Sequence, residues 1–487
     1  MHNVIVLIAQ LIVFICLVSV YLIGMPSYFS YTYIVVILII LGISLILFSI
    51  RKLPPSLKGN YLTSTFLFTL SFLIVHFQFY LDYALGFRQD LNLGMIYLNY
   101  DIVPKAISLA ALSAIAFFIG STFALLSPPK SRKFDIDFDV DIGNEIQSLR
   151  IIKLIMAFML ALYFYGTPMY YFQGGYNELM NNGSLSYIHY KSAHIFYLSI
   201  AAYIICMINM ILKKKMKLNI SQYLRIIGPT ALTIIAIYLC SCLIAGNRRP
   251  LIAILTLLAC GYYISQVKKL KLKNMVAIII VAASALQVTS FLRLVDGHQS
   301  LSERIELAIN NKAESANYTE PSILPFTTEL ATSLRAYHST VMHMEENKGV
   351  FGLSTVGYLI SIIPGLGLLV ESMTSIKLTT SSLLITEWMG ADHGMGTTVL
   401  ADVYIDYGFI GSIIIFLLFG ALLSRLDAVT YEKYLNNNLL VQILALLYIS
   451  NAVFLARSSI MQIFADIVLI YVIIKISKIL SPKRTVY

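Results

Sequence analysis

The sequence predicts an all-α membrane protein with about twelve transmembrane helices and one large loop on the outer side of the membrane. Two features of the composition support this prediction: 58% of the 487 residues are hydrophobic, and only 12% are charged. A soluble protein of this length would carry roughly twice that charged fraction. The third observation is the length of the apolar runs, most of which approach the roughly 20 residues that span a bilayer.

Twelve apolar runs follow one another along the chain, and their lengths suit helices. A transmembrane β-barrel would instead show alternating segments of about 10 residues. The first run begins shortly after His2 and has no small-residue cleavage site, so we expect a first membrane helix and no cleaved signal peptide. The expected spans are residues 4–23, 31–50, 61–80, 106–126, 151–171, 193–212, 226–245, 251–266, 275–292, 408–423, 439–456 and 460–474.

The orientation follows from the positions of lysine and arginine in the short loops. Basic clusters at 51–58, 130–133, 213–217, 268–273 and 475–484 all fall on one side when the N-terminus is placed in the cytoplasm, as the positive-inside rule requires. We therefore expect both termini in the cytoplasm. Because the formal net charge of +10 comes largely from these topology signals, it does not indicate nucleic-acid binding.

One further apolar run, 350–369, is long enough to span but contains four glycines and Pro364. If it spanned, the basic tail at 475–484 would lie outside, against the positive-inside rule. We therefore expect a broken, re-entrant or interfacial segment, which is tolerated at membrane depth where protein or a water-filled cavity covers it.

With that choice, a single outer loop of about 110 residues lies between the ninth and tenth helices, large enough for a small domain. The sequence thus divides into helices one to nine (1–293), the outer loop (294–403) and helices ten to twelve (404–487).

The basic residues differ in kind between the two sides. The expected outer side has seven arginines and five lysines, whereas only six of the 23 basic residues on the inner side are arginines. Topology signalling does not need arginine, but a bidentate grip on phosphate does. Six of the eight histidines also lie at or near the outer face: His189, His194, His298, His338, His343 and His393.

The sequence Gly-Asn-Arg-Arg-Pro at 246–250 forms a short turn that leads into an inward-running helix. Pro250 suits the first turn of a helix, where its missing N–H loses nothing. The positive end of that helix would then point outward beside Arg248 and Arg249, which together predict an anion site. The alternative is an interfacial arginine pair that holds lipid head groups.

Two other arginines stand at the outer ends of expected helices. Arg457 is followed by Ser458 and Ser459, which repeats the pattern of an outward helix start with hydroxyl caps. Arg293 ends its helix at the outer boundary, where the alternative is an arginine that reaches up to the interface.

The large loop contributes candidates for sugar and phosphate binding. Arg335 and His338 are spaced to share a helix face, and His343 shares it with His338 only loosely. No metal-site spacing of the HExxH kind occurs there, so we expect no metal. Further on lie Trp388, His393 and Asp402. Aromatic faces stack on sugar rings and carboxylates accept sugar hydroxyls, although aromatic residues also gather at membrane interfaces.

The segments FGLSTVGYLISIIPG (351–365) and GMGTTVLADVYIDYGFIGSIIIFLLFGAL (394–422), the 246–250 turn and the topology together resemble the Wzy-type oligosaccharide repeat-unit polymerases of bacterial O-antigen and capsule assembly. One departure is visible: the chain has Asp402 where the family pattern would place a glutamate before the tyrosine.

The resemblance implies an inverting glycosyl transfer at the outer leaflet of the bacterial cytoplasmic (inner) membrane, without a nucleotide sugar, metal or other cofactor. The donor would be a growing glycan on undecaprenyl pyrophosphate, and the acceptor a single lipid-linked repeat unit. The implied partners are these two substrates, the surrounding membrane lipids and a chain-length regulator, with no nucleic acid.

In this chemistry the leaving pyrophosphate gains negative charge, which arginines and a helix N-terminus would stabilise. We assign that role to Arg248 and Arg249, with Arg457 or Arg293. A histidine suits the base, and we favour His338 over His343 and His393. Arg335 would bind phosphate or sugar beside it.

Rival functions come from other classes. An O-antigen ligase shares the leaving group but transfers the whole chain to another acceptor. A flippase or other transporter would show polar groups along its spans, where mainly His76 and Asp466 are ionisable. A polyprenyl-phosphate sugar transferase usually carries acids in its first outer loop, and this loop, 24–30, has none.

Overall fold

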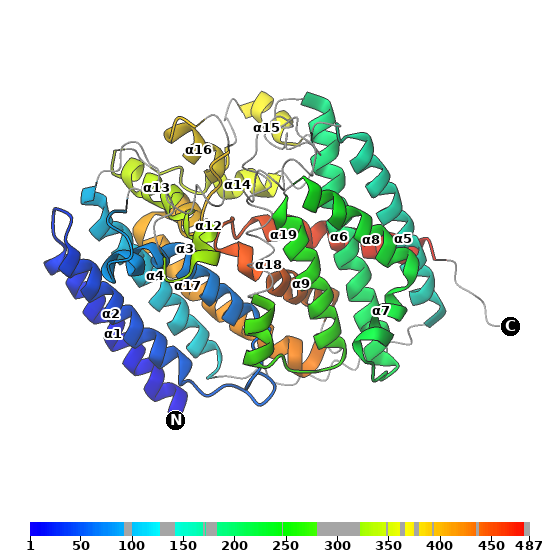
Figure 1. Ribbon diagram of the computed structural model, residues 1–487, viewed down its shortest axis with the longest axis horizontal. Coiled ribbons are helices and arrows are strands. Elements are labelled where there is room, and N and C mark those ends of the chain that lie inside the picture. The colour runs from blue at the N-terminus through cyan, green and yellow to red at the C-terminus, as the bar shows by residue number, and fades with distance from the viewer. Residues whose placement is uncertain are drawn as a thin grey trace.

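The computed structural model (Figure 1) describes residues 1–91, 100–126, 142–168, 171, 183–245, 247–279, 322–346, 349–360, 366–374, 379–391, 394–434 and 438–481. Within these ranges every regular element is a helix, as the sequence predicts.

In chain order, the long helices of the bundle come first, a group of short helices follows, and three long helices end the chain. The first part of the chain forms α1 (His2–Gly24), α2 (Tyr31–Ser49), α3 (Ser64–Ala84), η1 (Tyr100–Ile102), α4 (Val103–Ala124), α5 (Ile142–Tyr165), α6 (Gly183–Lys213), α7 (Ile220–Ile227), α8 (Pro229–Ile244) and α9 (Arg248–Ser265). The second part forms η4 (Pro325–Thr327), α12 (Thr328–Ala331), α13 (Leu334–Glu346), α14 (Leu353–Ile360), α15 (Leu366–Thr374), α16 (Ser381–Trp388), α17 (Val399–Lys433), α18 (Leu439–Leu455) and α19 (Gln462–Ile479).

Seven of the described helices are long and apolar enough to cross a membrane, namely α1 to α6 and α17. The number becomes eight if α7 and α8, which meet at a 91° bend, count as one span. Helices α9 and α18 are apolar but shorter, and the expected span at 275–292 is described only to residue 279. About twelve spans and the placement of the outer loop therefore stay predictions.

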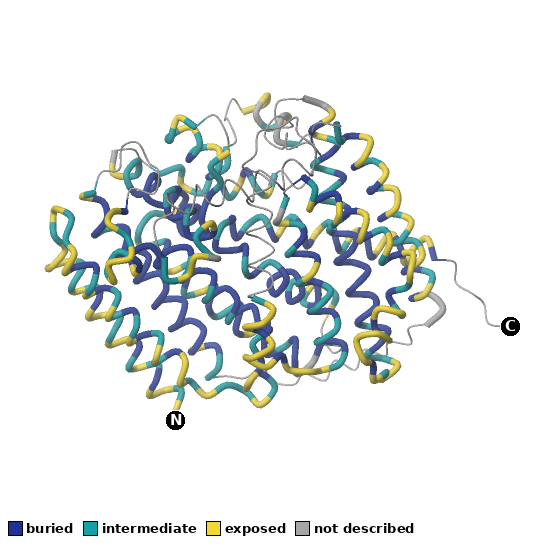
Figure 2. The backbone as a smooth tube through the Cα atoms, viewed as in Figure 1, coloured by how far each residue is buried: buried dark blue, intermediate teal, exposed yellow. Residues whose placement is uncertain are grey.

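The helices differ in how much of their surface is covered by protein. In the most apolar stretch of α1 only 17% of the residues are buried, whereas 94% are buried in that of α4. Figure 2 shows this contrast between the blue core helices and the yellow outer faces of α1 and α2. An exposed face made of isoleucine, leucine and valine suits contact with lipid tails, and a membrane helix satisfies its backbone hydrogen bonds internally. Helix α4 is therefore the centre of the bundle, and α1 and α2 form its rim.

Helices α4 and α17 cross closely, and two glycines face the opposite backbone at this crossing. A Cβ on Gly120 would overlap the carbonyl oxygen of Leu417, and one on Gly420 would overlap that of Phe117. Small residues at a crossing let helix backbones approach and maximise packing contacts, which is how membrane helices associate without a hydrophobic driving force. The α4–α17 pair is thus the rigid frame on which the other elements rest.

Helix α17 carries a carboxylate near each end of the bundle, and each one caps another helix. Asp427 accepts hydrogen bonds from the backbone N–H groups of Ser64 (2.8 Å) and Thr65 (2.9 Å) at the start of α3. Asp406 accepts them from Ser354 (3.2 Å) and Thr355 (2.8 Å) in the first turn of α14. The two carboxylates lie on either side of the break in α17 at Gly408.

Two of the lysine-rich loops, at 51–58 and 268–273, meet at the end of the bundle that holds the N-terminus. The ring of His2 contacts the carbonyl of Ile50 at 2.9 Å, and the Lys269 ammonium donates to the carbonyl of Lys58 at 3.1 Å. The short helices α13 to α16 lie at the opposite end from the N-terminus, along the upper edge of Figure 1. The assignment of these ends to the two sides of the membrane stays a prediction from the lysine and arginine positions.

The segment expected to be re-entrant or interfacial contains two separate short helices. Helix α14 has eight residues and α15 has nine, and each is far shorter than the roughly 20 residues of a span. Residues 361–365 between them lie outside the described part. Helix α17 begins at Val399, inside the expected outer loop, and a break at Gly408, with φ of 67°, separates its first turns from the expected span.

Candidate functional site

The candidate site lies at the end of the bundle where α9, α17 and α19 begin and α18 ends. A backbone hydrogen bond of 3.1 Å from Val399 to the carbonyl of Ala456 joins the start of α17 to the turn between α18 and α19. The side chain of Arg249, in the first turn of α9, reaches the first residue of α19. Three helix N-termini, each the positive end of a helix dipole, therefore meet in one region.

Arg249 is exposed, and its Nη2 donates to Oε1 of Gln462 at 3.0 Å. The predicted helix start is confirmed: α9 begins at Arg248, with Pro250 in its first turn. Its N-cap residue, Asn247, makes no side-chain capping hydrogen bond. A guanidinium has five N–H donors, so one bond to Gln462 leaves most of them for a ligand. The side chain of Arg248 lies outside the described part.

Asp402 is buried in the first turn of α17 and is surrounded by hydroxyl groups. Its Oδ1 accepts from the hydroxyls of Ser381 (2.6 Å) and Ser354 (3.3 Å), and the Ser459 hydroxyl also bonds to this carboxylate. These serines come from α16, α14 and the turn before α19. Asp402 therefore fastens three elements to α17, and its burial leaves little access for a sugar hydroxyl.

Two residues near Asp402 were not singled out from the sequence. Asp406 lies one turn later on the same face of α17 and caps α14, and the i, i+4 spacing of the two aspartates was the available signal. Tyr358 of α14 lies close to both Asp402 and Arg249. Partial burial and, to a smaller extent, the Asp402 charge raise the pKa of its phenol to about 12, against the lowering effect of the Arg249 charge.

His343 and Trp388, both predicted from the sequence, are brought together by α13 and α16. Their rings stack with centroids 5.2 Å apart and planes only 5° from parallel. The His343 Nδ1 contacts the carbonyl of Ser339 at 2.9 Å, which fixes the ring. Trp388 is partly exposed, so this aromatic pair offers a flat surface at the end of the bundle.

Arg335 and His338 lie on the same helix but in different surroundings. Arg335 is half-buried, and burial lowers the pKa of its guanidinium. Within the described ranges no hydrogen bond or ion pair involves its side chain.

His338 is fully buried, and its Nε2 pairs with the hydroxyl of Tyr80 at 2.6 Å. Burial lowers the pKa of its imidazole to about 3, and its Nδ1 has no partner among the described residues. His338 thus packs α13 against α3 and lacks the access to substrate that a base needs.

The remaining predicted residues are placed only in part. Arg457 lies in the turn between α18 and α19, partly buried, with its backbone N–H bonded to the carbonyl of Phe454 at 2.9 Å. It is two residues from Ser459, which binds Asp402. Arg293 and His393 lie outside the described residues.

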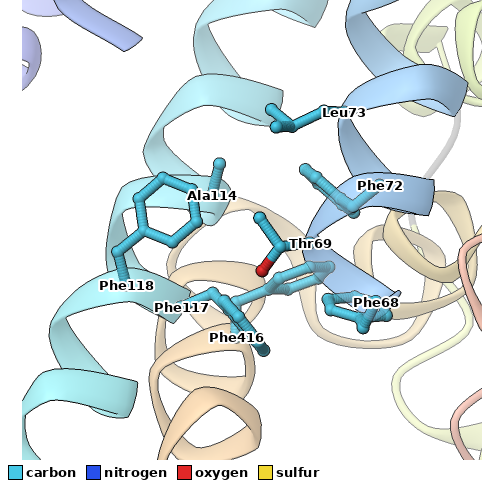
Figure 3. Close-up of a pocket in the computed structure, with 8 residues that line it drawn as sticks. All are labelled: Phe68, Thr69, Phe72, Leu73, Ala114, Phe117, Phe118 and Phe416. Carbon is cyan, nitrogen blue, oxygen red and sulfur yellow. The ribbon is translucent and has the colours of Figure 1, made fainter. Parts of the chain in front are cut away.

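A small cavity between α3, α4 and α17 is unrelated to this site (Figure 3). Its volume is about 10 Å³, close to the least space that one water molecule needs. Phenylalanines line most of it: Phe68, Phe72, Phe117, Phe118 and Phe416. Such a largely apolar gap is a packing defect inside the bundle.

An exposed arginine beside several helix N-termini at one end of an apolar helical bundle defines a membrane protein with a candidate anion-binding site. The family model of the O-antigen polysaccharide polymerase Wzy matches residues 4–485, nearly the whole chain, and the chain belongs to this family. No curated protein and no solved structure matches it. Membership confirms the resemblance seen in the sequence and makes the chain a polytopic glycosyltransferase-type polymerase of O-antigen polysaccharide.

Proposed function

We propose that the protein extends a glycan carried on undecaprenyl pyrophosphate by transferring it to a single lipid-linked repeat unit at the outer leaflet of the bacterial inner membrane. The family gives the class of reaction and its lipid-linked repeat-unit substrates. Beyond the family, we propose that the transfer inverts the anomeric carbon, that the lipid is undecaprenyl and that the reaction takes place at the outer leaflet. A partner that regulates chain length is an expectation from the family resemblance.

The observation that carries this proposal is the contact between Arg249 and Gln462, which brings the N-termini of α9 and α19 together. When the bond to the anomeric carbon breaks, negative charge develops on the departing pyrophosphate. Guanidinium donors and helix N-termini fixed in advance stabilise such charge without reorganisation. We assign pyrophosphate binding to Arg249, with Arg248 and Arg457 as its neighbours along the chain.

Sugar recognition in this proposal belongs to the short helices. The partly exposed ring of Trp388, held by its stack on His343, would accept the apolar face of a sugar ring. Arg335, half-buried and without a described partner, supplies a cation for the same glycan or for the second lipid pyrophosphate. Asp402 acts as a positioning residue, because its hydroxyl contacts hold α14 and α16 on α17.

The test is Arg249→Ala in cells that lack their own polymerase but make the lipid-linked repeat unit. We expect the ladder of long chains to shrink and the transfer rate to fall about 10²-fold, since loss of one donor to a developing anion costs on the order of 10²–10³ in rate. Arg249→Lys should recover part of the loss, because it keeps the charge without the bidentate geometry.

Arg225→Ala is the matched control: Arg225 is also exposed but lies in the last turn of α7. It should leave the ladder unchanged. Normal long chains made by Arg249→Ala at a normal protein level would contradict the proposal. Cells without the protein should attach single repeat units, whereas a complete lack of attached glycan would identify a ligase.

A further inference from the structure

A second polar cluster lies one helical turn deeper than Arg249, between α6 and α19. His194 of α6 and Asp466 of α19 are in hydrogen-bond contact, with Nε2 and Oδ1 2.8 Å apart. The Asp466 side chain is 8% exposed and that of His194 is 35% exposed. Within the described residues the Nδ1 of His194 has no hydrogen-bond partner, so one ring nitrogen is fixed and the other is open.

Four helices bring this pair next to the arginine. Asp466 lies four residues after Gln462, which binds Arg249, so both side chains share one face of α19. Tyr197, one turn after His194 on α6, lies within electrostatic reach of both Asp466 and Arg249. Its hydroxyl accepts a hydrogen bond of 2.9 Å from Asn451 of α18. The cluster is therefore continuous with the proposed pyrophosphate site.

We propose that His194 is the general base that takes the proton from the attacking sugar hydroxyl, with Asp466 holding its ring. This inference rests on the proposed function. A carboxylate that accepts the Nε2–H fixes the neutral tautomer in which Nδ1 carries the lone pair. A carboxylate–histidine pair of this kind also stabilises the imidazolium that forms when the proton arrives.

One glycosyl transfer forms one bond, breaks one bond and moves one proton. The acceptor hydroxyl oxygen forms a bond to the anomeric carbon of the donor glycan while the bond from that carbon to the phosphate oxygen breaks. The bonding electrons leave with the lipid pyrophosphate, toward Arg249. The hydroxyl proton passes to Nδ1 of His194, and the resulting imidazolium pairs with Asp466.

Three other described histidines are buried and less suited to this role. His338 is buried with Nε2 on Tyr80, and His189 is buried with Nδ1 on the Thr167 hydroxyl at 2.7 Å. His76 is buried between Phe72 and Thr398. None of these three has a carboxylate within ion-pair distance in the described part of the chain, whereas His194 combines such a partner with partial exposure.

The experiment compares His194→Gln with His189→Gln, because both replace a histidine of α6 by a neutral residue of similar size. The purified proteins are reconstituted in liposomes with lipid-linked repeat unit extracted from polymerase-deficient cells. We expect His194→Gln to lower kcat about 10²–10⁴-fold, the usual contribution of general base catalysis, with an unchanged KM for the donor. His189→Gln should stay within about threefold of the native kcat per folded protein.

Asp466→Asn is the second variant, in case His194→Gln fails to fold. The asparagine has the size of the aspartate but no longer fixes the required tautomer of His194. We therefore expect kcat to fall by about 10²-fold or more. Imidazole added to His194→Gly should restore part of the lost rate, which a purely structural role would not allow.

A His194→Gln enzyme with nearly native kcat, or one that loses activity only in proportion to folded protein, would overturn the inference and leave the proposed function standing. A native protein that makes no polymer in these liposomes would overturn both.

Discussion

Polar side chains at the end of the bundle that holds the candidate site make different kinds of contact. These contacts decide whether a side chain can also bind a substrate. Asp402 is enclosed by serine hydroxyls, and His338 is enclosed by α3 with Tyr80 on one nitrogen. Arg249 and His194, by contrast, each keep donor or acceptor atoms that no described residue uses. At the residue scale, therefore, accessibility separates groups that hold the fold from groups that can meet a substrate.

The burial of His338 predicts a pH dependence of stability. Its pKa is about 3 in the folded protein against an ordinary value of 6.5, so between these values the unfolded chain binds a proton that the native protein does not. The contribution of neutral His338 to the free energy of unfolding is then fully present above about pH 6.5, and it is lost as the pH falls toward 3.

The measurement is thermal unfolding in detergent between pH 7 and pH 4, on the native protein and on His338→Gln. The variant should lose markedly less stability than the native protein over this range, by on the order of 2–4 kcal/mol. Equal slopes for the two proteins would show that His338 does not take up the proton on unfolding.

At the element scale, α17 organises the molecule. It packs backbone to backbone on α4, caps α3 through Asp427, and caps α14 through Asp406. Helix α17 therefore positions the short helices at the site and also holds the start of α3 at the opposite end of the bundle. A substitution that disturbs the α4–α17 crossing should therefore shift the short helices and lower activity, even though no site residue is changed.

Gly420→Ala tests this frame. The added methyl would overlap the carbonyl oxygen of Phe117, a backbone atom that cannot turn aside, and overpacking of this kind costs about 1–3 kcal/mol. We expect a lower Tm in detergent and reduced polymer formation.

Gly42→Ala is its control, because a Cβ on Gly42 of α2 meets nothing within 4 Å. It should keep the native Tm or raise it slightly, since alanine has the higher helix propensity. If both substitutions lower the Tm equally, the close crossing does not stabilise the bundle.

At the scale of the whole molecule, the apolar runs predicted where helices lie, and the 246–250 turn predicted where α9 begins. The pairings were not predictable, because His194 and Asp466 are 272 residues apart and periodicity says nothing about which helices become neighbours. For the same reason the burial of His338 and the proximity of Tyr358 to Asp402 and Arg249 could not be predicted without the fold.

The orientation in the membrane is testable on a variant whose five free cysteines are replaced. Leu383→Cys on α16 and Lys58→Cys at the other end place single thiols at exposed positions. A membrane-impermeant maleimide should label Leu383→Cys from outside intact spheroplasts, and Lys58→Cys only after lysis. The reverse pattern would move the proposed site to the cytoplasm.

The central claim is that this chain alone joins lipid-linked repeat units. The most direct measurement is elongation by the purified protein in liposomes that contain only the extracted undecaprenyl-pyrophosphate repeat unit, followed by separation of the glycans by size. We predict a ladder of products that differ by one repeat unit, made without nucleotide sugar and lost in Arg249→Ala. A single-unit product, with or without movement of the lipid across the bilayer, would contradict the account.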